Sequence, residues 1–402
     1  MQEGKLSGYR WIILFLSSFL IFSIDYVQFQ ISGLAYLIMP ALNLDVAQFS
    51  ALLMAPMLVG AILSVPAGAL ADRYGSKIVV TVAAAIALAG TIGRMFAGDF
   101  ITMLVMMLGT GFLGCAVQTV TIKLYGAWFE DKLDFAMGVF FACACAGIGL
   151  GLATSPMFPD VNSAYIFSDV MTAVALVLWI LFARNTPAGM SLPEPEPVIK
   201  NLGVVARNKY VWLVGIIVGL GLGTATNYSG ILPQALIDVR GVDPTLAGTM
   251  AAVIQFVGIA GSIIGPIMCR KNPRLMCAFI AVFGGFIMIA NWFVPLGPIM
   301  WIILIINGIF SVASGPVIQA MPFSLDGVGF KYAGAAGGLV GMVSLVISYF
   351  LPILIGVIAG PDYTVNFILE GVFYAAAAIP LLMLPKNVGK VDETELVAES
   401  VM

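Results

Sequence analysis

An acidic residue, Asp25, lies near the middle of the first long apolar segment of the chain. Gln28, Ser32 and Tyr36 follow it at helical spacing and therefore share its face. A charged side chain in such a segment costs roughly 3 kcal/mol or more at a bilayer centre unless it is paired or hydrated. We therefore expect this face to border a hydrated cavity, with Asp25 binding and releasing a proton and with Gln28 and Tyr36 binding substrate. The alternative is an Asp25 that a neighbouring group keeps permanently neutral.

A basic residue, Lys123, lies near one end of a later apolar segment, with Thr119 one helical turn before it. An ammonium group beside a hydroxyl group suits a carboxylate or another small anion, so we expect both residues to bind substrate. Two alternatives remain open. The four methylenes of Lys123 could carry its ammonium to the membrane surface, or Lys123 could pair with Asp25 across the cavity.

The second half of the chain offers uncharged polar side chains that would bind a solute through hydrogen bonds. The predicted binding residues there are Asn227, Tyr228, Gln255, Asn307 and Gln319, and Thr224 and Ser311 are further candidates. Hydrogen bonding between helices is the alternative for about half of them. The stretch Ser-Gly-Ile-Leu-Pro233 directly after Tyr228 predicts a break in the helix that exposes backbone groups to the solute.

Three further ionisable residues in or near the apolar segments favour a structural role. Asp169 and Glu370 occupy nearly equivalent places in the two halves, and we expect them to be paired or to lie at the membrane interface, with a role as substrate ligands as the alternative. Arg94, with Asp99 close by, is expected to be an interfacial charge.

Composition places the chain in a lipid environment. Of its 402 residues 61% are hydrophobic and 10% are charged, against about 25% charged residues in soluble proteins. There is no histidine, and the five cysteines show no metal-ligand spacing, so we expect neither a metal site nor a cofactor nor an enzyme. Nucleic acid is not an expected partner.

Twelve apolar runs are long enough to be spanning helices. They are predicted at 11–39, 47–71, 78–96, 101–123, 135–158, 164–182, 211–232, 245–268, 275–294, 299–321, 333–358 and 365–384. This predicts an N-terminal six-helix bundle (1–184), an extended linker rich in Pro and Glu (185–209), a C-terminal six-helix bundle (210–386) and a tail (387–402).

The distribution of basic residues predicts the orientation. With both termini in the cytoplasm, sixteen of the 18 Lys and Arg residues lie toward that side, and only Arg94 and Arg240 do not. The two halves also repeat at an offset of 198 residues, which places Asp45 on Asp243 and Arg73 on Lys271. A duplicated pair of bundles is the simplest explanation.

The loop after the second predicted helix reads Gly68-Ala-Leu-Ala-Asp72-Arg73-Tyr-Gly75-Ser-Lys77. This pattern, together with twelve helices in a six-plus-six repeat, resembles the major facilitator superfamily. The resemblance implies a secondary transporter that works by alternating access, in which Gly68, Asp72, Arg73, Gly75 and Lys77 form a conformational latch between the halves. A tight charged turn that only fixes topology is the alternative. The resemblance also implies a monomer in a bacterial inner membrane.

The segments Gly90-Thr-Ile-Gly93-Arg94 and Lys123-Leu-Tyr-Gly-Ala-Trp128 are similar to the branch of that superfamily that carries small anions. Nitrate carriers have arginines inside helices 2 and 8, and this chain has none there, so we expect a proton-coupled carrier of a monovalent organic anion, a carboxylate. Export or antiport of hydrophobic or cationic compounds is one alternative. A transporter-like receptor without flux is another.

Overall fold

The computed structural model describes residues 8–129, 132–187, 198–325, 328 and 332–389. Twelve helical segments in this part of the chain are long and apolar enough to cross a membrane, and the described residues contain no strand. The prediction of an all-helical membrane protein with twelve spans is therefore confirmed.

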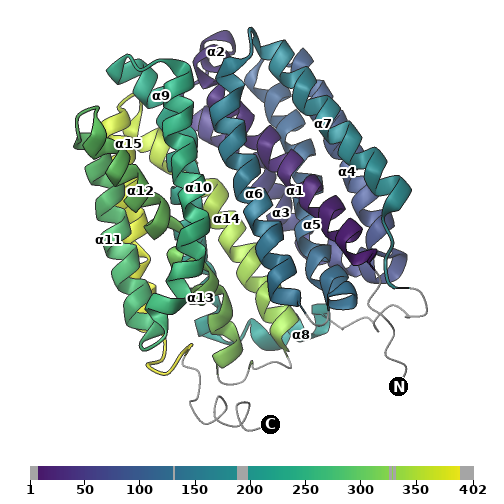
Figure 1. Cartoon of the computed structure of the whole chain (residues 1–402). Coiled ribbons are helices and arrows are strands. Elements are labelled where there is room, and N and C mark those ends of the chain that lie inside the picture. Colours follow the sequence, from purple (N-terminus) through teal and green to yellow (C-terminus); the bar gives the residue numbers. More distant parts are fainter. Residues whose placement is uncertain (1–7, 130–131, 188–197, 326–327, 329–331, 390–402) are drawn as a thin grey trace, which may run out of the picture.

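The first six spans lie in the purple to blue half of Figure 1. They comprise α1 (Arg10–Gly33), α3 (Val46–Tyr74), α4 (Ser76–Gly93) with η1 (Arg94–Phe96), α5 (Phe100–Trp128), α6 (Leu133–Thr154) with η2 (Ser155–Met157), and α7 (Val161–Phe182). A short helix, α2 (Ala35–Ala41), follows α1.

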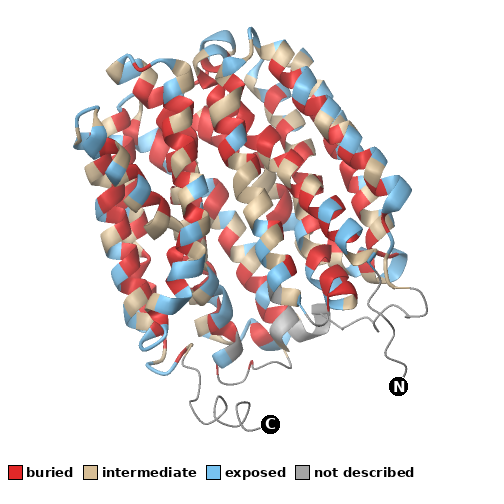
Figure 2. Ribbon diagram, viewed as in Figure 1, coloured by how far each residue is buried: buried red, intermediate tan, exposed pale blue. Residues whose placement is uncertain are grey.

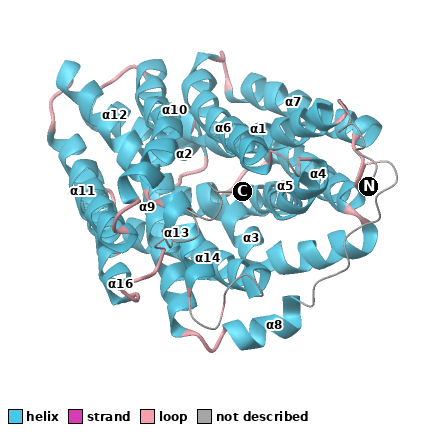
Figure 3. Cartoon of the chain, turned by 60° about the horizontal axis from the view of Figure 1, so that its bottom comes forward, coloured by secondary structure: helices cyan, strands magenta, loops and turns pink. Residues whose placement is uncertain are grey.

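The other six spans form the green to yellow half. They comprise α9 (Lys209–Arg240), α10 (Pro244–Cys269), α11 (Pro273–Phe293), α12 (Pro298–Ala313) with α13 (Gly315–Ala320), α14 (Ala333–Ala359), and α15 (Tyr363–Ala376) with α16 (Ala378–Met383). A 3-10 turn, η3 (Met321–Ser324), follows α13. The expected linker contains a further short helix, α8 (Val198–Val205), which packs beside α14 (Figure 3), so this part of the linker is not extended as predicted.

The helices begin differently at the two ends of the molecule. We call the end where α1 begins and α16 finishes the terminal end, and the opposite one the far end (Figure 1). Aspartate side chains accept backbone hydrogen bonds at five helix starts at the far end, namely Asp45, Asp99, Asp160, Asp243 and Asp362. Such caps satisfy the free N–H groups and place negative charge at the positive end of the helix dipole.

These caps lie just outside the spans, and at two of them the backbone hydrogen bonds lower the pKa of the carboxyl group. The backbone N–H of Thr102 holds the pKa of Asp99 below its usual range, and the N–H of Ser163 does the same for Asp160. Asp45 and Asp243, which the 198-residue offset aligns, both cap the second span of their half. The repeat seen in the sequence is therefore also a structural one at this point.

Two helix predictions needed correction. The first run is not one helix to residue 39, because α1 ends at Gly33 and α2 starts after Leu34, which puts Tyr36 on α2. The break expected at Pro233 is absent, since α9 continues through Gly230 and Pro233 to Arg240. Neighbouring helices can compensate for the hydrogen bond that a proline removes within a span.

The packing differs between the two ends of the molecule. At the far end a single buried core joins both halves and includes Phe29, Leu53, Tyr228, Leu232 and Met250. At the terminal end the buried residues form two separate cores, one from the first half and one from the second. Figure 2 shows that buried residues occur along the helices of both halves. Among the described residues, the two halves thus share a buried hydrophobic core at the far end and have separate cores at the terminal end.

Candidate functional site

The face of α1 that carries Asp25 extends from the terminal end, where the two halves have separate cores, into the shared core at the far end. Gln28 is buried and donates its Nε2 hydrogen to the backbone oxygen of Leu53 on α3, at 2.8 Å. Ser32 is also buried, next to Gly230 of α9 in the other half. Asp25 lies seven residues before Ser32 and is therefore about 10 Å closer to the terminal end along the helix. This face therefore points at the contact between the halves.

Asp25 itself is half-buried and forms no hydrogen bond or ion pair with any other described residue. Its position is just below the shared core, on the side where the two halves have separate cores. The alternative expectation was an Asp25 that a neighbouring group keeps neutral. No residue in the described part of the chain pairs with its carboxylate in this way.

Lys123 is paired, but not with Asp25. Its Nζ donates a hydrogen bond to Oδ1 of Asp72, so α5 and α3 of the same half are joined. The Lys123 side chain remains 43% exposed, and that of Asp72 is 15% exposed. Thr119 lies one turn away and faces Gly68 of α3. The predicted anion-binding residue and the predicted latch residue therefore contact each other.

The rest of the predicted latch forms a compact turn. Gly75 has a φ of +85°, a conformation that favours glycine, and the backbone N–H of Lys77 donates to Oδ1 of Asn185 at 2.7 Å. Trp179 of α7 donates its indole hydrogen to the Lys77 oxygen. Arg73 is exposed and lies over the ring of Tyr74. These contacts hold the loop against its own half.

The polar candidates of the second half fall into two groups. Gln255 is half-buried and donates to Ser229 Oγ at 2.9 Å, linking α10 to α9 just below the shared core. Gln319 is exposed near the terminal end, Ser311 is half-buried, and Asn307 is buried with its Nδ2 unpartnered. Sequence reasoning missed Ser229, although a serine within an apolar span is itself a signal.

Asn227 and Tyr228 instead point into their own half. Asn227 donates its Nδ2 hydrogen to Oε1 of Glu370 on α15 at 2.6 Å, and Tyr228 donates to the Met288 oxygen on α11 at 3.2 Å. Thr224 is buried and donates to the Leu220 oxygen of its own helix. The interhelical alternative therefore describes Asn227 and Tyr228 better than substrate binding does.

Arg94 is not the interfacial charge that we expected. Only 2% of it is exposed, and its guanidinium donates to Gln30 Oε1 at 2.7 Å, to Ser168 Oγ at 2.6 Å and to the Val27 oxygen at 3.2 Å. The carboxylate of Asp169 lies 3.9 Å away. Asp169 is therefore a paired acid, one of the two roles expected for it, and the pair ties α1 and α7 to the end of α4.

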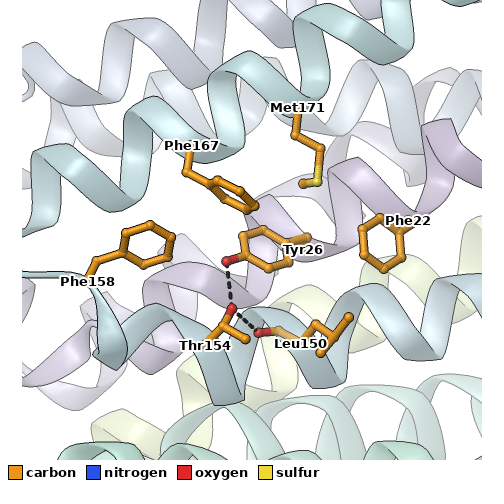
Figure 4. Close-up of a pocket in the computed structure, with 7 residues that line it drawn as sticks. All are labelled: Phe22, Tyr26, Leu150, Thr154, Phe158, Phe167 and Met171. Atoms are coloured by element: carbon orange, nitrogen blue, oxygen red, sulfur yellow. Dashed lines mark hydrogen bonds between the residues drawn. The ribbon is translucent and has the colours of Figure 1, made fainter.

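A separate apolar pocket of about 180 Å³ lies between α1, α6 and α7. Figure 4 shows the rings of Phe22, Tyr26, Phe158 and Phe167 around it, together with Met171. The Tyr26 hydroxyl lies 2.8 Å from Thr154 Oγ1 and supplies the polar contact drawn there. Aromatic rings and a methionine suit an apolar ligand.

Two repeated sets of six spans, with a shared buried core at one end and separate cores at the other, point to a known family of transporters. Residues 11–348 match the family model described as Major Facilitator Superfamily. The chain belongs to the major facilitator superfamily. It is thus a transporter and not an enzyme.

Several curated members of the superfamily are similar to this chain over most of its length. The probable nitrate/nitrite transporter NarK2 of Mycobacterium tuberculosis is 24% identical over 82% of this chain and 85% of its own length. The probable sulfoacetate transporter SauU of Cupriavidus necator is 24% identical over 91% of each chain. The nitrite extrusion protein of Bacillus subtilis is 22% identical over 84% of this chain and 85% of its own.

Solved structures of superfamily members share the fold. The nucleoside transporter NupG superposes with a TM-score of 0.73 at 12% identity, covering 94% of this chain and 99% of that one. A bacterial homologue of the human lysosomal transporter Spinster gives a TM-score of 0.69 at 16% identity, over 94% of this chain and 95% of that one.

Proposed function

We propose that this chain carries a small monovalent anion, a carboxylate, by alternating access and together with a proton bound at Asp25. The observation that carries the proposal is the half-buried, unpartnered carboxyl of Asp25 directly below the shared core. In alternating access, a carboxyl group at this level of the bundle would be exposed first to one side of the membrane and then to the other. The names of the relatives, which include nitrate, nitrite and sulfoacetate, support an anion.

The binding site for the anion would lie at Lys123 and Thr119, which are one helical turn apart on α5. Lys123 supplies the positive charge, and its half-exposed side chain is reachable from the terminal end. An anion that binds Lys123 competes with Asp72 for the same ammonium group. Substrate binding would then release Asp72, and the latch and the cargo would be coupled through one lysine.

A carboxylate fits this chain better than nitrate does. The cores of α3 and α10 contain no basic residue, since Arg73 stands at the last turn of α3 and α10 has none. A single lysine matches the single charge of a monocarboxylate, whose remaining polar atoms can bind hydroxyl and amide groups.

The distribution of charge supports a cytoplasmic location for both termini. The five aspartate caps are at the far end, while the latch loop and the α10–α11 loop with Arg270 and Lys271 are basic. Basic loops favour the cytoplasmic side of a bacterial inner membrane. We propose a monomer as the working unit.

The proposal is tested by transport into proteoliposomes. A panel of labelled monocarboxylates, nitrate and efflux dyes is offered with and without an imposed proton gradient. Gradient-stimulated uptake of a carboxylate that is lost in Asp25→Asn supports the proposal. Asp45→Asn is the matched control, because asparagine still caps α3 and the same carboxylate-to-amide change is made outside the spans.

Export of apolar or cationic compounds is the second candidate, favoured by the aromatic pocket beside Tyr26. In that case dyes would be transported and Lys123→Gln would leave their export unchanged, which contradicts the anion proposal. Absence of any flux from a folded protein would instead support a receptor.

A further inference from the structure

Five buried polar residues meet inside the second half, where Tyr228 also forms part of the shared core. They are Asn227 and Tyr228 of α9, Asn291 of α11, and Asn366 and Glu370 of α15. Each is at most 1% exposed. Asn227 donates to Glu370 Oε1 at 2.6 Å, and Asn291 Nδ2 donates to the Tyr228 hydroxyl at 2.7 Å. Asn366 stands one helical turn before Glu370 on the same face of α15.

This cluster has more acceptors than donors. Four of its buried oxygens have no hydrogen-bond partner, namely Glu370 Oε2, Asn227 Oδ1, Asn291 Oδ1 and Asn366 Oδ1, whereas the one unpartnered donor is Asn366 Nδ2. A buried polar atom without a partner costs about 1–3 kcal/mol. A group of such atoms in a native protein therefore indicates an occupant.

The charge of Glu370 also lacks compensation. No described basic side chain forms an ion pair with it, and Arg240, which reaches the end of α11, donates to the backbone oxygens of Trp292 and Val294 instead. Taking an unpaired carboxylate out of water costs several kcal/mol, so an ionised Glu370 requires a cation.

We propose that the Glu370 cluster binds a monovalent metal cation, with sodium as the best fit. Carboxylate and carbonyl oxygens are the ligands that hard cations prefer. One carboxylate neutralises a monovalent ion, whereas a divalent ion would leave a net positive charge buried in an apolar bundle. The Nδ2 groups of Asn227 and Asn291 are already engaged, so their oxygens can face the ion without either amide turning over.

A proton or water could occupy the cluster instead. A proton on Glu370 would supply one donor and so satisfy one of the remaining acceptors. Water brings two donors per molecule but no positive charge for the carboxylate. A cation supplies the charge and accepts several oxygen ligands at once, which is the combination that the cluster lacks.

Binding of radioactive sodium to the purified full-length protein in detergent tests the proposal. We expect saturable binding to the wild type that is lost in Glu370→Gln and weakened at least about tenfold in Asn366→Leu, which removes one oxygen ligand. Asp25→Asn, a carboxylate-to-amide change in the first half, should bind sodium as the wild type does. This separates the outcome from that of the proton-coupling experiment.

Thermal unfolding of the wild type gives a readout that does not depend on any variant. Replacing sodium with N-methylglucamine at constant ionic strength and pH should lower the unfolding temperature, and sodium should restore it. Absence of saturable binding together with an unfolding temperature that responds only to pH would show a proton or water in the cluster and overturn the proposal.

Discussion

The Nζ of Lys123 on α5 donates a hydrogen bond to the carboxylate of Asp72 on α3 at the terminal end of the first half. This contact joins the residue expected to bind the anion to the residue expected to act in the latch. Binding of a substrate anion would therefore break an existing ion pair, which makes occupancy and latch release parts of one event.

Separating the two residues tests this coupling. We expect Lys123→Gln to abolish carboxylate uptake, while Asp72→Asn keeps binding but slows transport. The pair is partly exposed, so its loss should change the free energy of unfolding by less than about 1 kcal/mol. Substrate binding and uptake are measured on both variants, with the exposed Lys132→Gln as the control. Normal uptake by Lys123→Gln would rule out this role.

The buried Arg94 network makes a stability prediction. Removing the guanidinium in Arg94→Met leaves Gln30 and Ser168 without their shared donor and Asp169 without its ion-pair partner, which should destabilise the protein by about 3 kcal/mol or more. Thermal unfolding in detergent measures the loss against exposed Arg270→Met. Equal unfolding temperatures for the two variants would show that Arg94 is not a structural centre.

Close packing of α6 on α1 can be tested with two glycines of the same helix. A Cβ at Gly151 would lie 2.7 Å from the backbone oxygen of Tyr26, whereas a Cβ at Gly138 would have nothing within 4 Å. Gly151→Ala should therefore destabilise the protein by about 1–3 kcal/mol through overpacking. Gly138→Ala should be neutral or stabilising by up to about 1 kcal/mol. The opposite ranking in a thermal unfolding assay would contradict the packing.

Movement at the far end can be tested by cross-linking α3 to α14. A Cβ at Gly356 would lie 3.0 Å from the Cβ of Ala47, which is closer than the roughly 3.5–4.5 Å of a disulfide, so in a cysteine-free background Ala47→Cys and Gly356→Cys should form one after a small outward shift of α14. We expect oxidation to stop transport and reduction to restore it, because alternating access requires this end to open. Full transport by the quantitatively cross-linked protein would exclude that motion.

Much of the fold could be predicted from the sequence. Apolar runs of suitable length located all twelve spans, because the bilayer requires helices there. An aspartate precedes several of the helices that begin at the far end and marks where each helix starts. Asp45 and Asp243 are two of these residues, and the sequence repeat already aligned them. The continuation of α9 through Pro233 could not be foreseen, since it depends on the helices packed around it.

The side-chain contacts were harder to predict. Arg94 stands at a helix end close to Asp99, which suggested a position at the membrane interface. It is buried because α1 and α7 pack over it. The partner of Lys123 is 51 residues away on another helix, and no local pattern specifies that pairing. Polar residues in apolar spans, such as Gln30 and Ser168, were the available signals.

Proton movement during anion uptake tests the central proposal most directly. Proteoliposomes in weakly buffered medium are given a transported carboxylate salt without an imposed gradient, and the external pH is recorded. We predict alkalinisation of the medium with wild-type protein and none with Asp25→Asn, while Asp25→Asn still exchanges labelled carboxylate across the membrane. Anion uptake without any pH change in the wild type, or an unchanged pH signal in Asp25→Asn, would contradict the role of Asp25 as the proton carrier.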